Sequence, residues 1–273
     1  MKSRGSFTVT CSKLPLVLVA CIFLMPSIVQ PQSGHSGRSA HDITPDAKAP
    51  QPPINDRAAI LAKKDGQPPL GGHWGVRYAT IEDPSLPRVL LIGDSIANGY
   101  GARVAEQLEG KANVDLWLTP EWLGPELDRQ AAEIAGRYPY DIIHFNESGL
   151  HAWAPGRVPD GQYGPRMRAY IGVLRKAAPH ARLIWASTTP ITVLGHPTEL
   201  NELDKQISKR NALCRKIMSE EAIPVDDLYK VIIHRLNLAS GDRFHWNHEG
   251  SEVLANAVVQ SILPFLQNAP SPK

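Results

Sequence analysis

Short apolar segments alternate with amphipathic segments from residue 87 onward, and this alternation constrains the fold more than any other feature. The apolar segments are rich in β-branched residues and have the length of buried strands; they cover 88–93, 113–118, 141–146 and 182–187, with a weaker one at 223–229. Apolar residues at helical spacing follow them, in 123–134, 167–174, 207–218 and 253–262. Strands that alternate with helices build parallel sheets covered on both faces. The sequence therefore predicts a three-layer α/β/α sandwich around a parallel sheet.

The first thirty residues differ from the rest of the chain. Basic residues, among them Lys2 and Arg4, precede an apolar stretch over 14–29, and polar residues come next. This order is typical of a secretory signal, so we predict export to the periplasm or the outside of the cell. Leu18–Cys21 also resembles a lipoprotein cleavage box, and an uncleaved membrane anchor is a further alternative. Residues 1–30 are thus assigned to a signal peptide or an N-terminal anchor.

Composition indicates how the rest of the chain is organised. Residues 31–86 are rich in proline, glycine and polar residues, and are predicted to form a linker and a lead-in segment that packs on the domain. The domain itself is placed at 87–268, and 269–273 form a tail. The formal net charge is only +2, which is too small an excess to attract nucleic acid, so no such partner is predicted. Outside the signal Cys214 is the single cysteine, and its helical context favours a buried apolar role.

Polar residues follow the predicted strands where an α/β sheet normally carries its active site, at the carboxyl ends. Ser95 follows the first strand and Asn146 the third, while Asp242 and His245 precede the last helix. A carboxylate three residues before a histidine can hold the tautomer that leaves Nε2 free as a base. Each feature also has a structural interpretation, since Ser95 could cap a helix and Asp242 with His245 could form a surface turn. No phosphate-loop or G-x-S-x-G pattern surrounds Ser95.

Four blocks, taken in order, resemble those of the SGNH, or GDSL, hydrolase family. They are IGDSI with Ser95, PEWLGPE with Gly124, HFNESGLH with Asn146, and DRFHWNHEG with Asp242 and His245. The resemblance covers residues 86–266 and implies a flavodoxin-like sheet of five parallel strands. The third block departs from the common G-x-N-D and resembles an F-N-x-G-L-H variant of bacterial members associated with carbohydrate esters.

The resemblance also implies roles for these residues. Ser95 would be the nucleophile, His245 the general base, and Asp242 the group that orients the imidazole. The backbone N–H groups of Ser95 and Gly124 and the side-chain amide of Asn146 would form the oxyanion hole. The implied activity is that of an exported serine esterase that hydrolyses O-acetyl or other O-acyl esters of carbohydrate through an acyl-enzyme. The expected partner is therefore a small-molecule or glycan ester.

Aromatic residues beside the blocks are candidates for substrate binding. Trp122, Trp153 and Trp246 each neighbour one block, and His151 follows Asn146. Aromatic faces suit sugar rings and acyl chains, although packing of loops onto the sheet is the alternative for each of them. The ten histidines show no standard zinc spacing, so no metal is predicted. The mechanism implied by the resemblance needs no organic cofactor. Two other functions stay open: an O-acyltransferase with the same triad, and a non-catalytic carbohydrate-binding protein.

Overall fold

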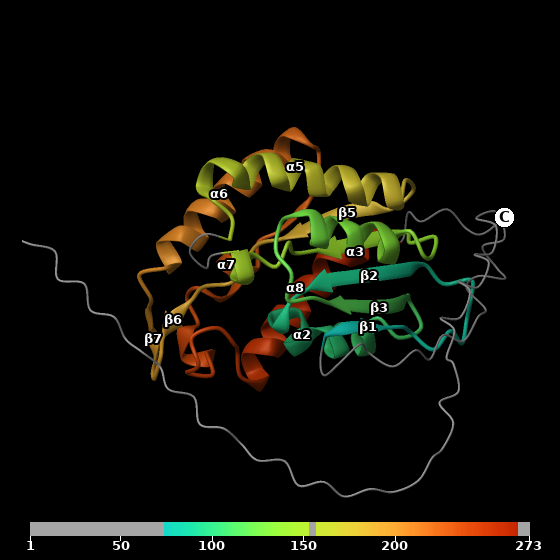
Figure 1. The fold of residues 1–273 in the computed structure, drawn as a ribbon. Coiled ribbons are helices and arrows are strands. Elements are labelled where there is room, and N and C mark those ends of the chain that lie inside the picture. The colour runs from blue at the N-terminus through green and yellow to red at the C-terminus, as the bar shows by residue number, and fades with distance from the viewer. Residues whose placement is uncertain (1–73, 153–156, 267–273) are drawn as a thin grey trace, which may run out of the picture. The chain divides into compact units, whose positions relative to one another are not determined.

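The computed structural model describes residues 74–152 and 157–266 (Figure 1). The predicted signal or anchor at 1–30 and the tail at 269–273 lie outside the described residues, as does most of the linker. None of the described helices is both long enough and apolar enough to cross a membrane.

A six-stranded sheet lies at the centre, in the order β1-β3-β2-β4-β5-β8. Its strands are β1 (Gly75–Arg77), β2 (Arg88–Gly93), β3 (Asn113–Leu118), β4 (Ile142–Phe145), β5 (Arg182–Ala186) and β8 (Val225–Asp226). All except β1 are mutually parallel and follow the flavodoxin-like order, as predicted. The expected number of strands was too low, because the lead-in segment adds β1 antiparallel to β3, with Gly75 opposite Leu118. Three residues that pair through the backbone alone give no periodic signal in the sequence.

Helices cover both faces of the sheet (Figure 1). The helices are α2 (Ser95–Gln107), α3 (Pro125–Ala135), α4 (Gly149–Ala152), α5 (Asp160–Ala177), α6 (Asp204–Glu220), α7 (Leu228–Ile232) and α8 (His248–Leu266), with a 3₁₀ turn at Leu236–Leu238. Side chains of α3, α5 and α6 share one apolar core with the sheet, and those of α2, α7 and α8 share the other. The three-layer prediction is confirmed.

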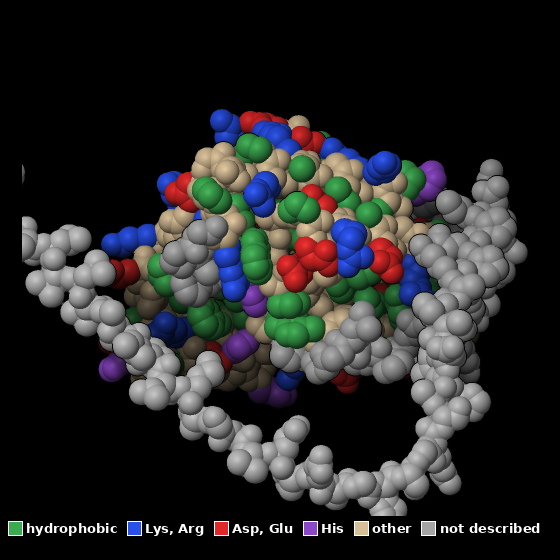
Figure 2. Space-filling view, in the orientation of Figure 1, with side chains coloured by type: hydrophobic (Ala, Val, Ile, Leu, Met, Phe, Trp, Pro, Cys, Tyr) green, Lys and Arg blue, Asp and Glu red, His purple; other side chains and the backbone are tan. Residues whose placement is uncertain are grey.

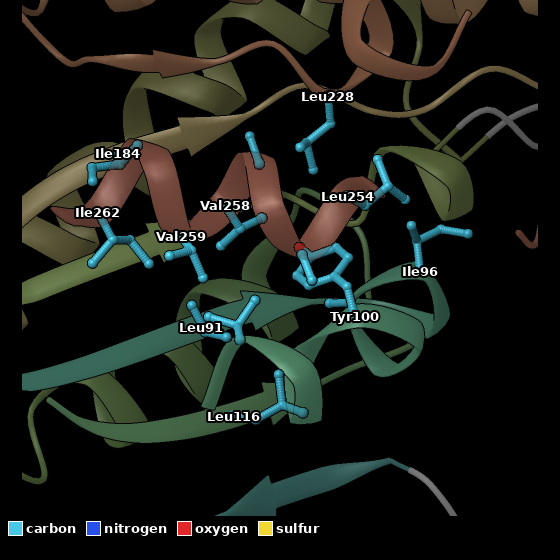
Figure 3. Close-up of a cluster of buried hydrophobic side chains, with 14 of the residues drawn as sticks. Leu91, Ile96, Tyr100, Leu116, Ile184, Leu228, Leu254, Val258, Val259 and Ile262 are labelled. Atoms are coloured by element: carbon cyan, nitrogen blue, oxygen red, sulfur yellow. The ribbon is translucent and has the colours of Figure 1, made fainter. Parts of the chain in front are cut away.

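Strand β2 shows why the sheet needs both layers. All six of its residues are buried; Leu90 and Ile92 face the α3/α5 core, while Val89 and Leu91 face the α2/α8 core. Figure 3 shows the second core, where Val258 and Val259 of α8 approach Leu91. Because successive strand residues point to opposite faces, only a strand between two helical layers can bury such a run completely.

The order of the strands also fixes where a site can form. From β2 the chain continues to β3 on one side and later reaches β4 on the other. The carboxyl end of β2 is therefore the switch point of the sheet, where loops diverge and leave a crevice. Ser95 is the second residue after this strand end.

Candidate active site

The loop between β2 and α2 presents Ser95. Asp94, and not Ser95, is the N-cap of α2, since its carboxylate accepts a hydrogen bond from the Ile96 N–H at 2.9 Å. The turn is tight, because a Cβ on Gly93 would lie 2.6 Å from the Cβ of Ala97. Ser95 is the first helical residue and is half-buried. Its hydroxyl is therefore free of capping and lies 2.8 Å from Nε2 of His245.

Asp242 holds the other side of the His245 ring. Its Oδ2 lies 2.6 Å from Nδ1 of His245, and its Oδ1 accepts the backbone N–H groups of His245 and Phe244. Burial disfavours the charged carboxylate, but these hydrogen bonds outweigh burial and hold the pKa of Asp242 well below its usual range. The structure thus brings together Ser95, His245 and Asp242. The His245 ring lies between the other two, as expected for a base that contacts a nucleophile on one side and an orienting carboxylate on the other.

The loop that carries this Asp-His pair is held from two sides. Ala239 pairs with Trp246 across its base, and the Ser240 N–H donates to the His245 carbonyl at 2.9 Å. A hairpin of β6 (Thr192–Val193) and β7 (His196–Leu200) packs on its tip, where the Thr192 N–H donates to the Arg243 carbonyl at 2.9 Å. Arg243 has a φ of 90°, a strained value for a non-glycine residue. The hairpin was not predicted from the sequence, because its strands are short: β6 has two residues and β7 has five.

Asn146 lies where β4 ends, but its amide already has partners. Nδ2 donates to the Ala186 carbonyl at 2.8 Å and lies 3.2 Å from Oγ1 of Thr188, while Oδ1 accepts the Gly149 N–H at 3.0 Å. An oxyanion would therefore have to replace the longer contact, to Thr188. Thr188 follows β5 in the chain, and no pattern in the sequence indicated it as a partner of Asn146.

The third block differs from the F-N-x-G-L-H pattern by one residue, because both Glu147 and Ser148 separate Asn146 from Gly149. Ser148 has a φ of 56°, and Glu147 points into the core. The Glu147 carboxyl accepts the Tyr163 hydroxyl at 2.6 Å and Nε1 of Trp185 at 2.7 Å. Burial raises the pKa of Glu147 in spite of these bonds. Glu147 thus anchors the loop to the core.

Gly124 occupies the N-cap position of α3. A Cβ there would lie 3.0 Å from Nη1 of Arg166, which donates to the Leu123 carbonyl at 2.9 Å. A side chain at Gly124 would therefore disturb this contact. The role of its N–H in an oxyanion hole stays a prediction.

Two of the four predicted substrate-binding residues lie together. The Arg157 guanidinium is 4.3 Å from the Trp122 ring centroid and donates to the His151 carbonyl. The His151 ring meets Trp74 edge-on at 5.7 Å. Burial and the charge of Arg157 lower the pKa of His151, which favours a neutral ring. Arg157 thus connects Trp122 to His151, and the His151 ring contacts Trp74.

The other two predicted substrate-binding residues are Trp246 and Trp153. Trp246 is 8% exposed and packs in the α2/α8 core, so its prediction as a substrate-binding residue is wrong and the packing alternative holds. Trp153 lies outside the described residues. Cys214 is fully buried against Glu147, as its sequence context indicated. Within the described part of the chain, no group of three or more His, Cys, Asp or Glu side chains could hold a metal ion.

This sheet order and its covering helices define the fold of the GDSL-like lipases and acylhydrolases. A search of solved structures finds, for example, a carbohydrate esterase family 3 protein of Talaromyces cellulolyticus, with a TM-score of 0.56 and 16% identity over 67% of this chain and 99% of that one. A variant of an acetyl xylan esterase of Geobacillus stearothermophilus matches with a TM-score of 0.53 and 16% identity over 64% and 94% of the two chains. A GDSL-like lipase of Bacteroides thetaiotaomicron matches with a TM-score of 0.50 and 15% identity, over 65% and 88%. No protein-family model and no curated protein matches the sequence.

Proposed function

We propose that this protein is an exported serine esterase that removes acetyl groups from carbohydrate. The observation that carries the proposal is the continuous hydrogen-bonded series from Ser95 through His245 to Asp242, at 2.8 and 2.6 Å. Its place at the switch point of a GDSL-type fold supports the same reaction class. Acetate as the acyl group is supported by similar structures described as an acetyl xylan esterase and an acetyl esterase.

The proposed reaction uses these residues in turn. Nε2 of His245 takes the Ser95 proton as Oγ attacks the ester carbonyl carbon. The carbonyl oxygen becomes an oxyanion, which the N–H groups of Ser95 and Gly124 and the Asn146 amide would stabilise. The imidazolium, stabilised by Asp242, then protonates the leaving sugar oxygen as its bond to the acyl carbon breaks. Water, deprotonated by the same Nε2, attacks the acyl-enzyme, releases acetate and regenerates Ser95.

Removal of the nucleophile tests the proposal. Ser95→Ala should lower turnover of p-nitrophenyl acetate about 10⁴–10⁶-fold, and Ser95→Ala/His245→Ala should be hardly worse because the residues act as a unit. Ser261→Ala is the matched control, since this hydroxyl bonds the Val258 carbonyl on α8. Circular dichroism and thermal unfolding check that each variant folds. If Ser95→Ala kept more than a tenth of wild-type turnover, or the double variant showed additive losses, the triad would be wrong.

Substrate class and export need separate measurements. Release of acetate from acetylated xylan, compared with longer p-nitrophenyl esters, should favour the acetylated glycan, and transfer to an added glycan instead of water would indicate an acyltransferase. The intact mass of the protein from its native host should place the N-terminus near residues 30 to 40. A lipid-modified species that begins at Cys21 would replace simple export by a lipoprotein anchor.

A further inference from the structure

A groove runs along the edge of the sheet, between β1 and α3. We call it the edge groove; its volume is about 340 Å³, and the lining residues used below are Trp74, Tyr78, Thr119, Glu121, Arg129, Glu133 and Arg137. This volume lies within the range of pockets that bind small molecules in proteins. The groove is separate from the Ser95–His245–Asp242 series, none of whose residues line it.

One end of the edge groove lies beside the candidate active site. Because β1 is antiparallel to β3 and Gly75 pairs with Leu118, Trp74 lies next to Thr119, just past the carboxyl end of β3. The Thr119 N–H donates to the Gly93 carbonyl at 2.9 Å, and Gly93 is two residues from Ser95. The edge-on contact of Trp74 with His151 connects the same end to α4, the short helix that follows Asn146. A ligand in the groove can therefore continue towards Ser95.

The other end lies at Tyr78, on the far side of β1. The Arg137 guanidinium lies 5.1 Å from the Tyr78 ring centroid, and the Tyr138 ring meets Tyr78 edge-on at 5.5 Å. From Trp74 to Tyr78 an extended chain spans about 13 Å, at ~3.3 Å per residue. An aromatic ring thus stands at each end of a groove longer than a single acetyl ester.

The charges along the groove balance. Glu121 and Glu133 oppose Arg129 and Arg137 among the lining side chains, and Figure 2 shows acidic and basic side chains alternating over α3. Arg129 is paired with Glu126 at 2.7 Å and with Glu133 at 3.4 Å. A groove without net charge, with aromatic rings and many hydrogen-bonding groups, suits a neutral ligand that has both apolar faces and hydroxyl groups. Carbohydrate has this chemistry.

We propose that the edge groove binds the glycan chain of the substrate, with the acetylated sugar at Ser95 and the adjoining sugars along β1 from Trp74 to Tyr78. The proposal rests on the function proposed above, and assigns glycan binding to the segment that precedes the predicted domain. Trp74 and Tyr78 are then specificity-determining residues that have no part in the chemical step.

Kinetics on two substrates test this assignment. Trp74→Ala and Tyr78→Ala should each lower kcat/KM for acetylated xylo-oligosaccharides about tenfold, mainly through KM, and change kcat/KM for p-nitrophenyl acetate less than about twofold; tenfold corresponds to about 1.4 kcal/mol. Phe265→Ala is the matched control, because this ring also lies under an arginine, 4.6 Å from Arg182, at the opposite end of the sheet. Trp74→Phe should recover most of the loss. Equal losses on both substrates, or none on the oligosaccharide, would overturn the proposal.

Direct binding separates this proposal from the esterase function. The full-length Ser95→Ala chain, titrated calorimetrically with unacetylated xylo-oligosaccharide, should bind it, and the Trp74→Ala/Ser95→Ala chain should bind at least about tenfold more weakly. If the wild-type protein cleaved no ester but this binding and its dependence on Trp74 persisted, the esterase function would be wrong and the groove assignment would stand. If the protein cleaved acetyl esters but bound no oligosaccharide, the groove assignment would be wrong.

Discussion

Asp94 is a carboxylic acid that caps a helix from inside the protein. Its residue is 4% exposed, and this burial raises its pKa to about 6 against the opposing effects of the Ile96 N–H and the charge of His245. Tyr100 lies near the same carboxyl, and burial together with the charges of Asp226 and Asp94 raises the pKa of its hydroxyl. The folded protein therefore holds this proton at a pH where an unfolded chain has lost it.

The free energy of unfolding should therefore depend on pH through Asp94. Between about pH 4 and pH 6 the folded state binds more protons at Asp94 than the unfolded state, so this group makes the free energy of unfolding fall as pH rises, by up to about 3 kcal/mol. Asp94→Asn keeps a good N-cap and should remove this part of the slope in urea unfolding measured at pH 4.5 and 7. Asp227→Asn, at the partly buried N-cap of α7, is the control. An unchanged slope in Asp94→Asn would contradict the assignment.

Single residues also show which parts of the candidate site could be predicted from the sequence. Ser95, Asp242 and His245 could be grouped because strand ends of one parallel sheet converge, and a local spacing of three brings Asp242 to His245. The partners of Asn146 could not be predicted, since Ala186 and Thr188 belong to a different strand end. Trp246 was misassigned because sequence position beside a block says nothing about the direction of a side chain.

At the scale of elements, α4 packs so closely on the loop after β5 that Gly149 admits no side chain. A Cβ there would lie 1.9 Å from Oγ1 of Thr188, the residue that contacts the Asn146 amide. Gly149→Ala should therefore lower the free energy of unfolding by about 1–3 kcal/mol and, by displacing Thr188 and Asn146, lower turnover per folded molecule.

Gly172→Ala is the matched control for Gly149→Ala. A Cβ at Gly172, on the exposed side of α5, meets no atom within 4 Å. This change should raise the free energy of unfolding by about 0.5–1 kcal/mol, because alanine loses less backbone entropy in a helix. Thermal unfolding and p-nitrophenyl acetate turnover measure both variants. Normal turnover in a folded Gly149→Ala variant would show that the packing of α4 against Thr188 does not affect the candidate active site.

Helices and strands could be predicted from the sequence where their burial produces a regular pattern of apolar residues. The strand segments at 88–93 and 113–118 coincide with β2 and β3, because both faces of these strands are buried and every position is apolar or paired. The hairpin β6–β7 was not predicted, because most residues of β7 are exposed and show no apolar pattern. Its place is fixed by backbone bonds to the loop of Asp242, which no side-chain pattern encodes.

At the scale of the whole molecule, one buried carboxylate joins four segments. Asp115 of β3 accepts hydrogen bonds at 2.8 Å from Nε of Arg88, the Tyr140 hydroxyl and the Ala79 N–H. Arg88 and Asp115 are both fully buried. Burial raises the pKa of Asp115 even though Arg88 opposes this. The amino-terminal end of the sheet thus depends on a charge pair that is costly to break.

Asp115→Ala should lower the free energy of unfolding by about 3–5 kcal/mol, because it leaves the Arg88 guanidinium buried without a counter-charge. Glu126→Ala removes an exposed partner of Arg129 and should cost far less, because solvent screens an exposed ion pair. Urea unfolding of the two variants, with the wild type, gives the comparison. Equal costs would mean that Arg88 finds compensation elsewhere in the folded state.

Strand β1 has a consequence for how the chain tolerates cleavage. Its three residues occupy the hydrogen-bonding edge of β3, and an uncovered strand edge is a template for pairing with another copy of the chain. Proteolysis between Arg77 and Arg88 would remove Trp74 and Val76 together with this cover. The same cut would remove Trp74, which we propose to bind glycan, and would promote aggregation through β3, so loss of glycan binding and loss of solubility should arise together.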